Sequence, residues 1–133
     1  MIFKGPSLTD PIFLMLVLLF LFQIKHMFAD FYLQTPRMLR ARGVYLHWGR
    51  LQHAGVHGVG SLLAMVVVGV PIGLALLMSV IDWIVHFHID WAKGRWSDHK
   101  GFGPDQAGYW RGFGVDQLAH QATYLVMAWI VIV

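Results

Sequence analysis

The chain has 133 residues, of which 57% are hydrophobic and only 13% charged, and its mean hydropathy is +0.58. A soluble domain carries about 25% charged residues, so we expect one membrane-embedded domain over residues 1–133. The absence of cysteine excludes disulfides and thiolate metal sites, and the net charge of +3 comes mainly from two loops, which favours anionic headgroups rather than nucleic acid as partners.

Four hydrophobic segments follow one another, each long enough to cross about 30 Å of hydrocarbon as a helix. They cover residues 11–34, 51–68, 74–91 and 115–133. Thr9 or Asp10 is the expected N-cap of the first, with Pro11 at its first helical position. A turn at residues 69–73, centred on Pro71, separates the second from the third. The sequence therefore predicts an all-α fold: a polytopic bundle of four transmembrane helices with up-down topology.

The start of the first segment also resembles the hydrophobic region of a signal peptide. No small-residue cleavage motif follows it, and the helical pattern continues to Gln34. We therefore interpret this segment as a membrane span.

Basic residues are concentrated in the first and third connections between these segments. The first carries Arg37, Arg40, Arg42 and Arg50, and the third carries Lys93, Arg95, Lys100 and Arg111. The positive-inside rule places both connections in the cytoplasm and both termini outside a bacterial inner membrane. Residues 93–114 are rich in glycine and aromatic residues, so we expect a long loop there, either an interfacial connector or a lid that contacts phosphate groups.

Each predicted span carries two ionisable residues that are four positions apart. The pairs are His26 and Asp30, His53 and His57, His86 and Asp90, and Asp116 and His120. Residues four apart share one helix face. In an up-down bundle all four pairs fall at the same level, on the cytoplasmic side.

These residue types at one depth favour a metal site. An aspartate at the centre of a membrane helix costs about 2.5–3.5 kcal/mol on insertion scales, so the pairs must face the interior and find partners. A divalent cation would neutralise the carboxylates, and nitrogen and oxygen ligands suit zinc best, with iron or manganese as alternatives. The ligand candidates are His26, Asp30, His53, His57, His86, Asp90 and His120, whereas Asp116 is either a ligand or the catalytic general base.

Two other interpretations of the polar residues stay open. Polar side chains also join membrane helices by hydrogen bonds, and a proton or ion pathway uses similar residues. A pathway would need polar groups continuing to the outer side, where the segments are mostly apolar. Lys25 is interpreted as a snorkelling residue, His88 as an interface residue, and His47 and His99 as solvated loop residues.

The ordered motifs resemble an uncharacterised family of small bacterial membrane proteins, number thirty-three-oh-seven in the domain-of-unknown-function series. The matching residues are His26-x-x-Ala29-Asp30-Phe31-x-Leu33-Gln34-Thr35, His53-x-x-x-His57-Gly58, His86-x-x-x-Asp90-x-x-Lys93 and Asp116-Gln117-x-x-His120. The resemblance covers nearly the whole chain and supports the site rather than a particular chemistry. A looser similarity connects the pattern to inner-membrane metal-dependent hydrolases.

Our functional hypothesis is a metal-dependent membrane hydrolase that acts on a lipid-linked or phosphate-bearing substrate. Two alternatives remain: a metal-binding transport or sensing protein without enzymatic activity, and a structural subunit of a larger membrane complex. Membrane lipids are expected partners, together with a second copy of the chain or other subunits.

Overall fold

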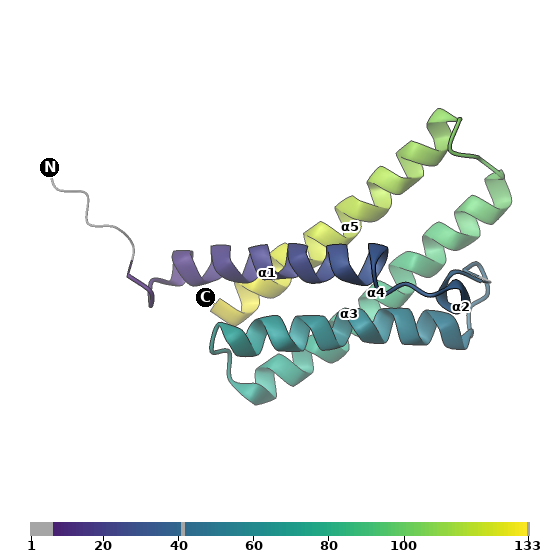
Figure 1. Cartoon of the computed structure of the whole chain (residues 1–133). Coiled ribbons are helices and arrows are strands. Elements are labelled where there is room, and N and C mark those ends of the chain that lie inside the picture. The colour runs from purple at the N-terminus through teal and green to yellow at the C-terminus, as the bar shows by residue number, and fades with distance from the viewer. Residues whose placement is uncertain (1–6, 41, 133) are drawn as a thin grey trace, which may run out of the picture.

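The computed structural model describes residues 7–40 and 42–132, which form long antiparallel helices and a one-turn helix in the first connection (Figure 1). The helices are α1 (Pro11–Phe31), α2 (Pro36–Leu39), α3 (Trp48–Val67), α4 (Ile72–Lys100) and α5 (Ala107–Ile132). Both α1 and α4 pack against α3 and against α5. The four long helices therefore close around one interior, and the all-α prediction is confirmed.

The local signals at the start of α1 and the end of α3 act as expected. The Asp10 carboxylate accepts hydrogen bonds from the backbone N–H groups of Ile12 at 2.8 Å and Phe13 at 3.2 Å. It therefore satisfies two of the amide groups that a helix start leaves free. Gly69, with φ of +83°, makes the turn between α3 and α4.

The predicted long loop over residues 93–114 is wrong. Helix α4 continues to Lys100, and α5 begins at Ala107. Gly101 ends α4 in a left-handed conformation, φ +63°, and its N–H donates to the Ser97 carbonyl at 2.9 Å. Only residues 101–106 connect the two helices, so His99, expected in the loop, lies in the last turn of α4.

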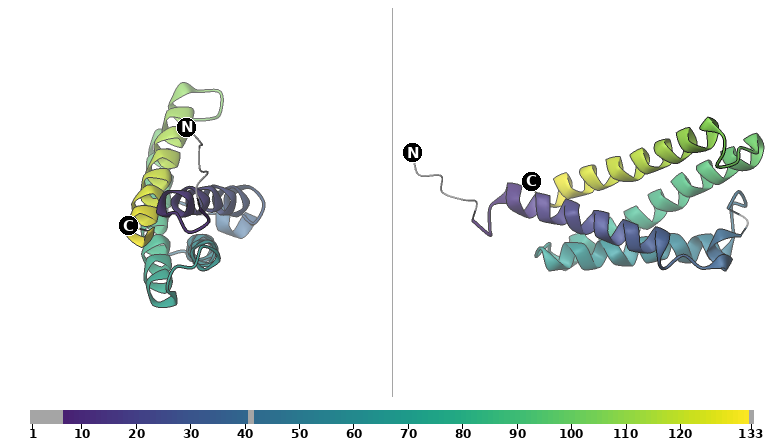
Figure 2. Two further views of the ribbon diagram at one scale, coloured as in Figure 1. Left: turned by 90° about the vertical axis from the view of Figure 1, so that its left-hand side faces the viewer. Right: turned by 45° about the horizontal axis from the view of Figure 1, so that its top comes forward.

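The glycines that suggested a loop are sites of close helix packing. A Cβ atom on Gly112 would overlap the Trp96 ring, and one on Gly108 would overlap the Phe102 ring. Each glycine thus makes room for an aromatic side chain of the α4 end or the following turn. The paired ends of α4 and α5 extend beyond the end of α1 (Figure 2); we call residues 93–114 the α4–α5 arm.

The bundle interior is divided into an apolar half and a polar half. The apolar half includes Leu18, Phe22, Met65, Met78 and Met127. The polar half contains His26, Arg50, His53, His57, Ser61, Asp82, His86, Asp116 and His120, all of them buried. The outside of the helices is largely apolar, with side chains such as Leu16 and Phe20 more than 60% exposed.

Within the part of the chain that the structure describes, α1 and α4 are the helices long and apolar enough to cross a membrane. Helices α3 and α5 do not meet this criterion of length and hydropathy. They carry the polar pairs His53/His57 and Asp116/His120. Two of the four predicted spans therefore meet this criterion in the structure.

We expect Gly94→Ala to lower the stability of the protein. Gly94 is buried on α4, and a Cβ there would lie 2.7 Å from the carbonyl carbon of Arg42, which is backbone and cannot rotate away. Overpacking of this kind costs about 1–3 kcal/mol. Thermal unfolding in detergent measures the change.

Gly73→Ala is the matched control, because nothing lies within 4 Å of a Cβ at that helical position. It should leave the melting temperature unchanged or raise it slightly. Equal melting temperatures for the two variants would contradict the packing of the Arg42 segment against α4.

Candidate metal centre

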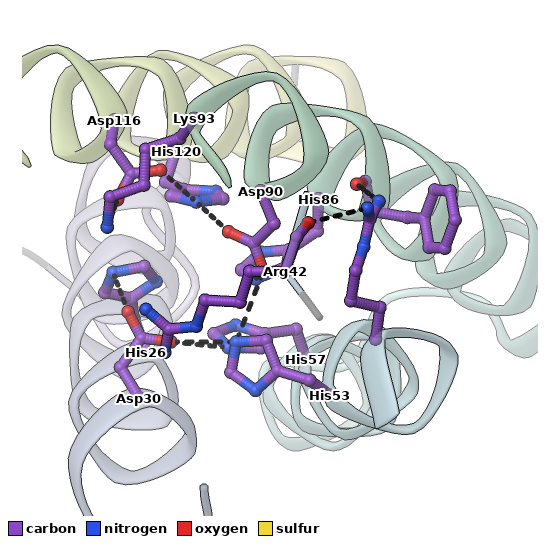
Figure 3. Close-up of polar contacts among 12 residues, drawn as sticks. His26, Asp30, Arg42, His53, His57, His86, Asp90, Lys93, Asp116 and His120 are labelled. Carbon is purple, nitrogen blue, oxygen red and sulfur yellow. Dashed lines mark hydrogen bonds and ion pairs between the residues drawn. The ribbon is translucent and has the colours of Figure 1, made fainter. Parts of the chain in front are cut away.

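The four ionisable pairs meet in the polar half of the bundle, one pair from each long helix (Figure 3). The centre of the His26 ring lies 5.3 Å from that of His57 and 5.2 Å from that of His120. His86 stacks between His57 and His120, at centroid distances of 3.6 Å and 4.1 Å. The interhelical arrangement thus brings the predicted side chains to one level.

Asp30 of α1 is contacted by three imidazoles. Its Oδ1 lies 3.0 Å from His57 Nε2 and 3.3 Å from His53 Nε2, and its Oδ2 lies 3.3 Å from His26 Nε2. His26 is on α1 with this carboxylate, whereas His53 and His57 are on α3. Asp30 therefore joins α1 to α3.

Asp90 of α4 is surrounded in the same way. Its Oδ2 lies 3.4 Å from both His53 Nε2 and His86 Nε2, and its Oδ1 lies 3.4 Å from His120 Nε2. His53 Nε2 therefore lies between the two carboxylates. The result is one connected cluster in which helices α1, α3, α4 and α5 all take part.

Several buried nitrogens of this cluster have no hydrogen-bond partner among the described residues. They are Nδ1 of His53, Nδ1 of His57 and both ring nitrogens of His86. Buried polar groups in folded proteins are nearly always paired. The Nε2 atoms of the same rings face the two carboxylates, and nitrogen and carboxylate donors that converge in this way are suited to a metal ion.

Two overlapping groups of donor atoms are close enough together to hold an ion. One consists of Asp30, His53, His57 and His86, and the other of His86, Asp90 and His120; within each group the ligand atoms lie within 4.8 Å of one another. The first offers three nitrogens and one oxygen, enough for a tetrahedral ion. The second offers three ligands and leaves a position open, which is the arrangement of catalytic zinc sites.

Two predicted site residues lie outside these groups. His26 is held through both nitrogens: Nδ1 lies 2.9 Å from the Tyr124 hydroxyl, and Nε2 lies 3.0 Å from Gln117 Oε1. Asp116 is buried, and its Oδ2 lies 3.3 Å from Lys93 Nζ. Both positions suit residues that orient or assist the metal centre rather than direct ligands.

A cavity of about 210 Å³ adjoins the cluster. Asp30, His53, Asp90 and Asp116 contribute to its wall, and Arg42 and Lys93 supply positive charge there (Figure 3). Arg50 also reaches the cavity, but its guanidinium donates to the backbone carbonyls of Arg42, Val44 and Phe87, each at 2.9 Å. Arg50 therefore anchors the segment that carries Arg42.

The interpretation of Lys25 as a snorkelling residue is wrong. Its ammonium group is buried and lies 2.9 Å from Asp82 Oδ2, which also accepts a hydrogen bond from the Ser61 hydroxyl at 2.7 Å. Lys25 also lies 4.3 Å from the centre of the Tyr124 ring. These residues form a second polar layer between the cluster and the apolar core.

Sequence reasoning did not assign Gln117 and Tyr124 to the site. Both lie on α5 with His120, three positions before it and four positions after it, and residues three or four apart share one helix face, so helical spacing could have found them. His88, expected at an interface, is exposed and contacts Tyr45 at 3.0 Å. His47, expected in solvent, accepts the Gly49 N–H as the N-cap of α3.

Comparison with known proteins identifies one relationship. No curated protein and no solved structure matches the chain, so the looser similarity to inner-membrane hydrolases has no support from them. A family model described as "Protein of unknown function (DUF3307)" matches residues 17–133, which includes every member of the cluster. The chain therefore belongs to the DUF3307 family.

Proposed function

We propose that this protein is a four-span membrane protein that binds a divalent metal and hydrolyses a phosphate-bearing substrate. The observation that carries the proposal is the group of buried imidazole Nε2 atoms of His53, His57 and His86, which lie 3.0–3.4 Å from the carboxylate oxygens of Asp30 and Asp90. Carboxylates in a low-dielectric interior need compensating charge. One divalent ion supplies it and at the same time takes as ligands the imidazole nitrogens that face the carboxylates.

Membrane insertion is supported by the distribution of polarity. Large apolar side chains cover the outside, whereas ionisable ones face the interior, which is the pattern that hydrocarbon imposes on polar residues. The first connection and the α4–α5 arm, which carry the basic residues, lie at the same end of the bundle (Figure 1). Under the positive-inside rule this end faces the cytoplasm.

Hydrolysis of a phosphate compound is supported by the cavity. Arg42 and Lys93 give it positive charge where an anionic group would meet the cluster. A bound divalent ion would supply Lewis-acid polarisation and an activated water. Asp116, buried at the cavity wall, is placed to accept a proton, and Lys93 keeps it oriented.

The donor set favours zinc, with iron or manganese as alternatives. Nitrogen-rich sites with carboxylate oxygens suit these borderline ions, and the absence of cysteine removes thiolate competition.

The alternative roles in transport or in a structural complex are less well supported. Leu18, Phe22 and Met65 are fully buried on the far side of the Lys25–Asp82 layer, so the polar interior ends in packed apolar side chains.

We expect the purified protein to retain zinc, iron or manganese, and chelation to lower its melting temperature in detergent. An ion present at a thousand times its Kd stabilises the folded state by about 4 kcal/mol. His57→Ala and Asp90→Ala should reduce retained metal and abolish most of the chelator effect. Elemental analysis and thermal unfolding provide the two measurements.

His88→Ala is the matched control, since His88 lies on α4 near His86 but faces the outside. It should retain metal and the full chelator response. A wild-type protein without metal, with a melting temperature indifferent to chelator, would leave the cluster as an interface between helices and would end the hydrolase proposal.

Asp116→Asn separates catalysis from metal binding. We expect it to retain metal but to slow hydrolysis of a phosphate ester about 10²–10⁴-fold, because a carboxamide cannot accept the proton. Asp90→Asn should lose both metal and activity. Initial rates with p-nitrophenyl phosphate or phosphatidic acid, beside elemental analysis, measure the difference. Unchanged turnover in Asp116→Asn would remove its role as a base.

The topology can be tested because the natural chain contains no cysteine. We expect single cysteines at Val44 and Lys100, both exposed, to react with a membrane-impermeant maleimide from the cytoplasmic side only. A cysteine at the exposed Ile72, the first residue of α4 at the opposite end of the bundle, should react only from the outside. Reaction of Val44→Cys and Lys100→Cys from opposite sides would contradict the four-span arrangement.

A further inference from the structure

A second cavity, of about 450 Å³, lies between α4 and α5 beside the metal centre. Its apolar walls include Ile89, Ala92 and Trp96 from α4 and Val115 and Ala119 from α5. Val115 is 68% exposed and Trp96 36% exposed, so this groove opens to the surroundings of the protein.

The groove and the cavity at the metal centre have a common wall. Lys93 and Asp116 line both, and they are the pair joined by the 3.3 Å contact between Nζ and Oδ2. Asp116 Oδ1 lies 3.6 Å from His120 Nε2, so the common wall is in direct contact with the cluster. A molecule that occupies both cavities and passes over the Lys93–Asp116 pair would have a polar end at the metal centre and an apolar end between α4 and α5.

We propose that the substrate is a phosphate-bearing lipid, with its phosphate in the cavity at the metal centre and one hydrocarbon chain in the groove between α4 and α5. The inference rests on the proposed function and specifies the substrate class. Positive charge is present in both cavities: Arg42 and Lys93 line the phosphate cavity, and Arg111 lines the groove.

A lipid chain fits the groove better than a helix of a partner protein. Two of its apolar wall residues are alanines, and the Trp96 ring packs against the backbone at Gly112, so the wall offers few side chains that could interlock with another helix. An apolar helix would also place apolar side chains against the guanidinium of Arg111, which lines the groove. A lipid phosphate provides an anion at the depth where a bilayer carries its headgroups.

Photo-crosslinking in nanodiscs tests the proposal on the full chain loaded with metal. Phosphatidic acid with a diazirine in its acyl chain is compared with phosphatidylcholine that carries the same chain. We expect the phosphatidic acid probe to label Ile89, Val115 and Ala119 selectively, as mapped by mass spectrometry. Ala92→Trp, which fills the groove without changing the cluster, should lose this labelling.

Ala122→Trp is the matched control, an exposed alanine of α5 outside the groove, and it should keep the labelling. Ala119→Trp provides a second groove variant should Ala92→Trp fail to fold. Equal labelling by both lipids, or labelling that survives both groove variants, would mean ordinary lipid contact and would overturn the inference.

Elemental analysis of the same samples separates this inference from the proposed function. Protein that retains metal but shows no preference for phosphatidic acid refutes the lipid groove alone, and hydrolysis of water-soluble phosphate esters can still support the enzyme. Protein without metal refutes both proposals.

Discussion

Two carboxylates, Asp30 and Asp90, have to be compensated inside a bundle whose exterior is apolar, and the rest of the polar half is arranged around them. They lie on α1 and α4, diagonal helices whose backbones have no close contact in the described part of the chain. His53 of α3 contacts both carboxylates, and His120 of α5 contacts Asp90. The cluster thus links the two diagonal helices, and its five imidazoles are positioned by the same contacts that compensate charge.

The division of the interior explains how such a cluster is tolerated. The apolar half, which includes Leu18, Phe22 and Met65, packs all four long helices against one another away from the site. The Lys25–Asp82 pair lies between the two halves and satisfies its own charges. Unpaired nitrogens at the cluster are costly on their own, and proteins accept such cost mainly at functional sites.

The α4–α5 arm gives the site rigid surroundings. Glycine positions on α5 allow aromatic rings of the α4 side to lie against the helix backbone, so both helices continue beyond α1. Lys93 and Asp116 are consequently held on helices, which positions side chains more accurately than loops do. The same close packing makes the groove, because two helices that meet through small residues leave a trough beside the contact.

The sequence by itself determined the fold class, the N-cap at Asp10, and the face of each helix that carries a His/Asp pair, because these follow from composition and from spacing along a single helix. It also predicted that the pairs would share one level. Only the tertiary structure decided that His53 would lie between both carboxylates, that His26 would contact Gln117 and Tyr124, and that Lys25 would pair with Asp82. These contacts depend on the rotation and separation of neighbouring helices, which result from packing across the whole interior. The long loop predicted over the glycine-rich arm is wrong for the same reason. A glycine favours a loop in one setting and close packing of an aromatic ring against a helix in another, and the residues opposite it decide which.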